Sequence, residues 1–174
     1  MDRLLDKTAK KKYNSHKKQQ IRNYKQYRKQ DAIRYEIQIQ GVTDMTIEER
    51  AKKAVELKTT GGYNCSQAVT AALADQTSLT EEQLKQLTAG FCAGMGNLEA
   101  TCGALIGAGM IIGLKTEGKG TLPKTKKLQE TFRDRCGAIQ CRELKTLIDG
   151  KPLCACEECV RNAVLIYGEV MGEA

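Results

Sequence analysis

The sequence predicts an all-α protein: a compact bundle of about six short helices around a central glycine-rich helix, with a basic N-terminal extension. Three observations support this fold class. From residue 47 onward apolar residues recur at helical spacing, capping motifs precede several of these stretches, and no stretch alternates apolar and polar residues as a half-buried strand would. The chain has 174 residues, of which 41% are hydrophobic, so it can bury a substantial core.

The first forty residues differ from the rest in charge and composition. They contain twelve Lys or Arg and four Asp or Glu, a net charge of +8, whereas the remainder carries −1 and holds every cysteine, glycine and proline. We therefore expect a basic extension over residues 1–43, helical or mobile, and a cysteine-rich helical redox domain over residues 44–174. The lysines and tyrosines of the extension would suit an anionic partner, and a merely solvated segment is the plainer alternative.

Three capped helices are predicted in the first half of the domain. Each follows a polar residue whose side chain can accept a hydrogen bond from the free N–H groups of the first helical turn. The caps and helices are Thr46 before 47–58, Asn64 before 65–73 and Thr80 before 81–90.

A glycine-rich helix is predicted over residues 102–114, with Thr101 as its cap. Its four glycines each cost about 1 kcal/mol relative to alanine, so close approach of another backbone or a cofactor is the expected compensation. Three more helices complete the domain. Pro123 suits the first position of a helix that ends at Cys136, a short helix over 141–148 follows, and a last helix covers 156–170.

The eight cysteines carry most of the chemical information. Their density is below that of a disulfide scaffold, and no export segment precedes them, so a reducing, cytoplasmic location is expected. In that setting thiols are first interpreted as metal ligands or redox groups. The longest apolar run, over 100–114, is too short to span a bilayer, and no transmembrane helix is expected.

The positions of the cysteines on the predicted helices are more informative than their spacing. Cys65 and Cys102 fall at the first residue of their helices, where free N–H groups and the helix dipole favour a thiolate. Cys156 and Cys159 form a CxxC pair one helical turn apart. The plainest alternative for any single cysteine is a small apolar core residue, and Cys92 and Cys136 fit that description best.

Several cofactor sites are excluded by the residues present. His16 is the only histidine, which excludes a Rieske centre because that centre needs two. Val160 follows Cys159, so there is no CxxCH motif for covalent haem attachment. The segment Gly107 to Gly109 lies within a helical pattern and is not a dinucleotide fingerprint.

The order of several short motifs resembles the C_GCAxxG_C_C family of redox-active proteins. The matching segments are Gly62 to Val69, Gly94 to Gly96, Thr101 to Gly107, Cys141 to Leu144 and the final Cys159. The resemblance covers about residues 47–170 and implies a small helical domain whose signature cysteines are Cys65, Cys102, Cys141 and Cys159. Because the related domain of split-Soret cytochromes holds an iron–sulfur cluster, it further implies a [2Fe–2S] cluster on these four residues, with Cys154 and Cys156 as additional candidate ligands.

Three functions stay open at this point. The first is an electron carrier or redox sensor with a cysteine-ligated iron–sulfur cluster, which the sequence favours over a stand-alone enzyme. The second is a metal-free thiol–disulfide protein that uses Cys156 with Cys159, or Cys65 with Cys102, as a reversible pair. The third is a zinc-stabilised module whose basic extension binds nucleic acid. The sequence names no redox partner, and a homodimer is compatible with it.

A four-thiolate [2Fe–2S] cluster would carry a charge of about −2 when oxidised and about −3 when reduced. Its burial would need nearby cations or helix N-termini. Among the arginines closest in sequence to the thiols, which are Arg135, Arg142 and Arg161, we expect Arg142 to be the compensating cation.

Overall fold

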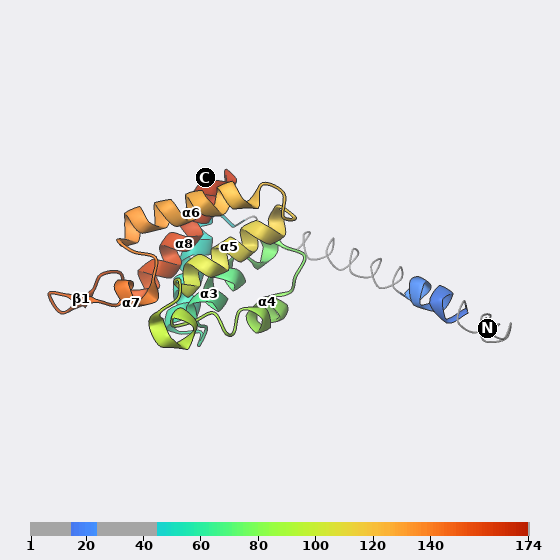
Figure 1. Cartoon of the computed structure of the whole chain (residues 1–174), viewed down its shortest axis with the longest axis horizontal. Helices are drawn as coiled ribbons and strands as arrows, with labels where there is room; N and C mark the ends of the chain where they lie inside the picture. The colour runs from blue at the N-terminus through green and yellow to red at the C-terminus, as the bar shows by residue number, and fades with distance from the viewer. Residues whose placement is uncertain (1–14, 24–44, 174) are drawn as a thin grey trace, which may run out of the picture. The chain divides into compact units, whose positions relative to one another are not determined.

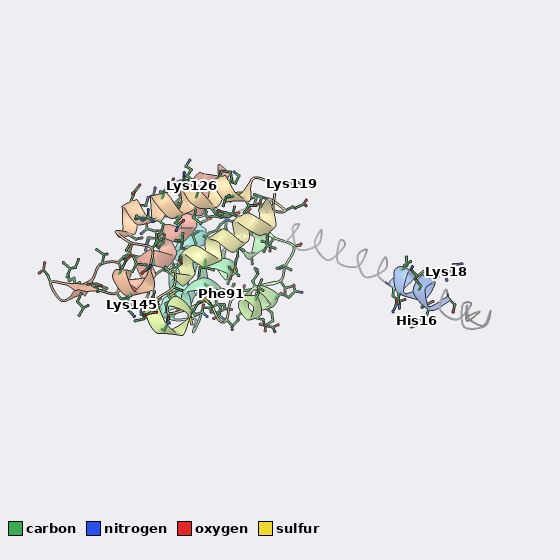
Figure 2. The ribbon with its side chains drawn as sticks, viewed as in Figure 1. His16, Lys18, Phe91, Lys119, Lys126 and Lys145 are labelled. Carbon is green, nitrogen blue, oxygen red and sulfur yellow. The ribbon has the colours of Figure 1, made fainter. Side chains whose placement is uncertain are left out.

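A computed structural model describes residues 15–23 and 45–173 and divides the chain into two units, Met1–Thr43 and Asp44–Ala174 (Figure 1). In the first unit, residues 15–23 form an exposed helix from which His16 and Lys18 project (Figure 2). The predicted character of the rest of the basic extension lies outside the described residues. No helix in the described ranges is long and apolar enough to cross a membrane.

The second unit is mostly helical, as predicted (Figure 1). Its elements in chain order are α2 (Ile47–Thr59), α3 (Cys65–Ala72), η1 (Ala74–Gln76), α4 (Glu81–Leu87), η2 (Gly94–Leu98), α5 (Gly103–Lys115), α6 (Thr121–Cys136), α7 (Cys141–Leu144), β1 (Leu147–Ile148), β2 (Lys151–Pro152) and α8 (Cys156–Met171). The two strands pair antiparallel, with Leu147 opposite Pro152.

The three predicted capping residues are confirmed. Thr46, Asn64 and Thr80 each accept a hydrogen bond from the backbone N–H three residues later, and the side chain of that later residue bonds back to the cap. These reciprocal bonds satisfy donors that a helix start leaves free. The helix after Thr80 ends at Leu87, three residues before the predicted end at Gly90.

Three details of the second half differ from the prediction. The N-cap of α5 is Cys102 rather than Thr101, because Thr101 forms a β-bridge with Gln140. The helix α6 begins at Thr121, so Pro123 occupies its third position instead of its first.

The predicted helix over 141–148 was also too long, since α7 ends at Leu144 and Ile148 lies in β1. Asp149 and Gly150 both have positive φ angles, 52° and 77°. An Asp-Gly pair in this conformation is typical of a two-residue hairpin turn. The preference of Asp149-Gly150 for a hairpin turn therefore outweighs the helical spacing of Cys141, Leu144 and Ile148.

The helices α5 and α8 occupy the interior of the bundle. The former packs against α3, α6 and α8, and the latter against α2, α3, α5 and α6. The largest fully buried side chains include Tyr167 of α8, Phe132 of α6 and Ile111 of α5. Because burying a side chain of this size contributes about 1.5–3 kcal/mol, this contact layer supplies much of the folding free energy.

Two of the four glycines in α5 have the close neighbours that the sequence predicts. A Cβ atom on Gly107 would lie 2.9 Å from the backbone oxygen of Ser66 in α3, and one on Gly103 would lie 2.2 Å from that of Phe91. Gly109 and Gly113 differ, because a Cβ there would meet only threonine methyl groups at 3.9 Å and 4.0 Å. Gly103 and Gly107 therefore let α3 and the segment before η2 approach α5.

We expect Gly107→Ala to destabilise the domain by roughly 1–3 kcal/mol, because the added methyl group meets backbone atoms that cannot rotate away. Gly109→Ala is the matched control in the same helix, and we expect it to stabilise by up to about 1 kcal/mol through helix propensity. Urea unfolding monitored by circular dichroism measures both changes. Equal effects of the two substitutions would contradict the close-approach explanation.

Candidate metal centre

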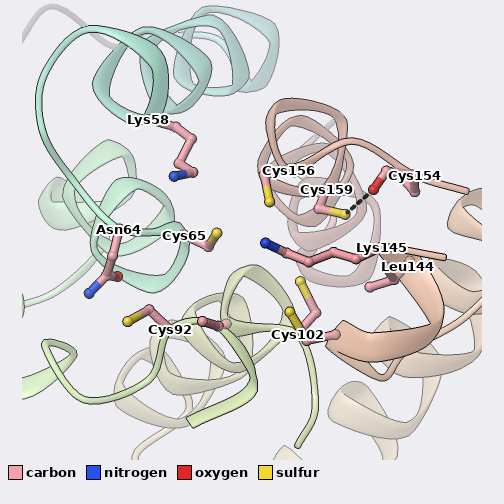
Figure 3. A pocket seen from close by; sticks show the side chains of 13 residues that line it. Lys58, Asn64, Cys65, Cys92, Cys102, Leu144, Lys145, Cys154, Cys156 and Cys159 are labelled. Carbon is pink, nitrogen blue, oxygen red and sulfur yellow. Dashed lines mark hydrogen bonds between the residues drawn. The ribbon is translucent and has the colours of Figure 1, made fainter. Parts of the chain in front are cut away.

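An open pocket of about 210 Å³ gathers most of the thiols (Figure 3). All four cysteines named by the resemblance line it, together with three others and two lysines. The lining thiols are Cys65, Cys92, Cys102, Cys141, Cys154, Cys156 and Cys159, and the lysines are Lys58 and Lys145. The eighth cysteine, Cys136, is 3% exposed and belongs to the hydrophobic core.

Four of the lining thiols stand at helix N-termini. Cys65, Cys141 and Cys156 are the first residues of α3, α7 and α8, and Cys102 is the N-cap of α5. Helix N-termini carry free N–H groups and the positive end of the helix dipole. The backbone therefore offers positive potential to any negative charge placed among these four sulfurs.

A short backbone contact brings Cys102 and Cys141 together. The N–H of Cys102 donates to the carbonyl of Ile139 at 2.8 Å, and the N–H of Cys141 donates to the carbonyl of Ala100 at 3.1 Å. These two bonds pair the segments that lead into α5 and α7. Both helices consequently begin at the same side of the pocket.

The start of α3 is held against the end of α4 by side-chain hydrogen bonds. Asn64, Ser66 and Gln67 donate to backbone carbonyls at Ala89, Thr88 and Lys85, at 3.0, 2.8 and 2.9 Å respectively. These bonds fix the first turn of α3 on both sides of Cys65. That thiol is therefore positioned by the backbone rather than by its own contacts.

The loop around η2 is wound tightly beside Cys141. Ala93, Met95 and Leu98 all have positive φ angles, at 46°, 58° and 67°. A Cβ on Gly94 would lie 3.0 Å from the Cβ of Cys141. Non-glycine residues in this conformation cost about 1–3 kcal/mol each and are concentrated at functional sites.

Cys65 of α3 and Cys156 of α8 are half-buried thiols that line the pocket (Figure 3). The hydrogen bond from Cys65 lowers the pKa of Cys156 to about 6, with further lowering by Lys145 and Lys58. The same hydrogen bond and burial raise the pKa of Cys65. The pair therefore holds one negative charge near neutral pH, on Cys156.

Cys102 is influenced by two other thiols that line the pocket, Cys156 and Cys159. Its pKa is lowered first by a hydrogen bond with Cys159 and then by the backbone N–H groups of Ala104 and Leu105 in the first turn of α5. Burial raises the pKa of Cys141. The lowering of the thiol pKa that we expect at a helix N-terminus is thus present at Cys102.

Cys136, Cys154 and Cys159 form a deeper group that the sequence did not indicate. Their sulfur atoms lie within 4.8 Å of one another, and the thiol of Cys159 donates to the carbonyl of Cys154 at 3.7 Å. The helical spacing of α6 correctly places Cys136 in the core. Nothing in the sequence shows that two other thiols pack on the same spot, because the three come from separate segments.

The cations of the pocket are lysines, not the arginine expected from the sequence. Arg142 forms an exposed ion pair with Glu99 at 2.5 Å, whereas Lys145 and Lys58 line the pocket. Lys145 comes four residues after Cys141, and this spacing places two residues on one face of a helix, whereas adjacent residues diverge. The sequence could therefore have indicated Lys145 as a pocket cation from its spacing to Cys141.

The fold and the pocket define a small helical, thiol-rich domain whose cysteines could hold a metal ion, and thiols at helix N-termini are a typical setting of thiolates. Residues 63–170 match the family described as "Putative redox-active protein (C_GCAxxG_C_C)". The chain belongs to this family, as its motifs indicated. No curated protein and no solved structure matches the chain significantly.

The ionisation of Cys156 gives a testable pH dependence in reduced, metal-free protein. Because its thiolate forms near pH 6, we expect alkylation of Cys156 by iodoacetamide to slow below pH 6 and to level off above pH 7. Cys65→Ala and Lys145→Met remove groups that lower this pKa, so both should move the profile to higher pH.

Lys126→Met is the matched control, because Lys126 lies on the outer face of α6 and pairs with Glu130 (Figure 2). Peptide mass spectrometry gives the rate at Cys156 separately from the other thiols. A profile that neither pocket substitution moves would contradict the assigned causes.

Proposed function

We propose that this protein holds a cysteine-ligated iron–sulfur cluster, of the [2Fe–2S] type, in the thiol pocket and acts as an electron carrier or redox sensor. The observation that carries the proposal is that thiols at the N-termini of four different helices line one pocket. Such a cluster supplies one-electron chemistry when bound. The family membership supports a redox role in the same domain.

The donor set fits this cofactor. Cysteine thiolate is the usual ligand of iron in such clusters, four of them complete the coordination of two irons, and hydrogen bonds to sulfur tune the potential. The pocket offers seven thiols, two lysine ammonium groups and the free N–H groups of the helix starts. These groups offset the cost of holding a negative cluster away from bulk water.

The contacts favour Cys156 over Cys159 as the fourth ligand. A charge on Cys156 raises the pKa of Cys65, Cys102 and Cys141, which are the other three proposed ligands. The pKa of Cys159 is instead raised by Cys102, Cys136 and Cys154. We therefore assign the cluster to Cys65, Cys102, Cys141 and Cys156, which replaces the Cys159 expected from the motif order.

A metal-free thiol–disulfide function is the second candidate, and one contact favours it. Cys65 is the largest influence on the pKa of Cys156, and Cys156 on that of Cys65, so this pair, rather than Cys65 with Cys102 or Cys156 with Cys159, would form the reversible disulfide. A zinc-bound form would use the same thiols. The nucleic-acid binding suggested for this zinc-stabilised module would involve the basic extension, and most of that extension lies outside the described residues.

Anaerobic analysis of iron and acid-labile sulfide separates these candidates. We expect about two of each per chain and visible sulfur-to-iron charge-transfer absorption. Cys65→Ser and Cys156→Ser should lose most of the iron, while Cys159→Ser and the control Cys92→Ser should retain it. Protein without iron and sulfide would refute the cluster, and loss of iron in Cys159→Ser alone would return the fourth ligand to that residue.

The pocket lysines should set the reduction potential. A positive charge stabilises the more negative reduced state, so we expect Lys145→Met to lower the potential measured by anaerobic redox titration. Arg142→Gln is the control, since that guanidinium is 64% exposed and paired with Glu99, and it should shift the potential less. A larger shift for Arg142→Gln would contradict the role given to Lys145.

A further inference from the structure

The deeper thiols form a group separate from the proposed cluster ligands. The sulfur atoms of Cys136, Cys154 and Cys159 are buried and lie within 4.8 Å of one another. None of the three belongs to the set of Cys65, Cys102, Cys141 and Cys156. This group is available for a function of its own.

The separation of these sulfurs matches the coordination sphere of one ion. In a tetrahedral zinc site each Zn–S bond is about 2.3 Å, which places neighbouring sulfurs about 3.8 Å apart. Sulfurs that already lie within 4.8 Å of one another need only small side-chain rotations to reach that arrangement.

The backbone around each thiol is fixed by its own hydrogen bonds. Cys136 ends α6, and the following Gly137 takes a left-handed conformation and donates to the carbonyl of Arg133 at 2.8 Å. The N–H of Cys154 donates to the carbonyl of Leu144 at 3.1 Å, and Cys159 lies one turn into α8. Three separately anchored segments therefore present their thiols to one point, as a preorganised metal site requires.

We propose that Cys136, Cys154 and Cys159 bind a single thiophilic ion of the zinc(II) type through three thiolates. Cys154 and Cys159 also line the thiol pocket, so the fourth coordination position faces that pocket. Binding releases the thiol protons to solvent, because the thiolate is the ligand. The weak hydrogen bond from Cys159 to the Cys154 carbonyl is lost in the same step.

The proposed metal site would connect three elements: the end of α6, the exit of the β1–β2 hairpin and the start of α8. Cys136 is in the hydrophobic core, whereas Cys154 is half-buried and follows the β1–β2 hairpin, whose Leu147 and Ile148 are 67% and 53% exposed. An ion at this point would connect the exit of the hairpin to α6 and α8. Its binding should therefore raise the thermal unfolding temperature.

Cobalt(II) is the probe, because thiolate ligation gives it charge-transfer bands and a tetrahedral field gives it visible absorption. The full chain carrying Cys65→Ser, Cys102→Ser, Cys141→Ser and Cys156→Ser lacks all four proposed cluster ligands, so cobalt can report the deeper site alone. We expect this reduced, anaerobic protein to bind about one equivalent of cobalt with thiolate bands, and zinc to displace it.

Adding Cys136→Ser or Cys154→Ser to this background should abolish the cobalt spectrum, and adding Cys92→Ser should leave it unchanged. Circular dichroism melting checks that each variant is folded, and the half-buried Cys154 provides a second test if replacement of the core residue Cys136 unfolds the domain. Absence of cobalt binding in the background protein, or binding unaffected by Cys154→Ser, would overturn the proposal.

Iron analysis distinguishes failure of the deeper site from failure of the cluster. Cys136→Ser and Cys154→Ser in the otherwise native chain should retain iron and sulfide if Cys65, Cys102, Cys141 and Cys156 are the cluster ligands. Protein that binds cobalt at the deeper site but never contains iron would refute the cluster alone. Protein that contains the cluster but fails the cobalt test would refute the deeper site alone.

Discussion

The arrangement of the domain depends on the meeting of helix N-termini around one small space. The starts of α3, α5, α7 and α8 surround the thiol pocket, and each brings a cysteine. Partial positive charges of equal sign repel, so such a meeting is unfavourable until negative sulfur occupies the centre. The close contact of α3 with α5 at Gly103 and Gly107 and the capping box at Asn64 hold two of these helix starts in place.

The thiols divide into two groups by position. Cys65, Cys102, Cys141 and Cys156 stand at helix starts beside two lysines, where charge is favoured. Cys136, Cys154 and Cys159 lie at the end of α6, after the hairpin and in the first turns of α8. Cys102 couples the two groups, because Cys159 lowers its pKa and the charge of Cys156 raises it. A change of charge in one group is therefore felt by the other.

Local features of this fold could be predicted from the sequence, whereas contacts across the domain could not. The caps at Thr46, Asn64 and Thr80 depend on residues three positions apart, and they were correct. The β-bridge that makes Cys102 the start of α5 joins residues nearly forty positions apart, and no local pattern reports it.

The same distinction holds within the pocket. The motif order gives four signature cysteines, and all of them line the pocket. The packing of α8 on α3 and α5 decides which of the sulfur atoms are neighbours. Lys145 could have been found from its spacing to Cys141, and the hairpin from Asp149 and Gly150. The closeness of Cys136 to Cys154 had no such signal, since it arises only when α6 and the hairpin exit meet.

Most buried residues of the core do not line the pocket. Phe132, Ile111 and Leu73 are fully buried, and Arg50 of α2 forms an ion pair with Asp75. The proposed ligands come from four segments spread over most of the domain, so no local stretch could hold a cofactor before the chain has folded. Insertion of the proposed cluster would therefore follow folding of the chain. For the same reason, a domain that lost this cluster by oxidation would keep its folded core and could take up a cluster again.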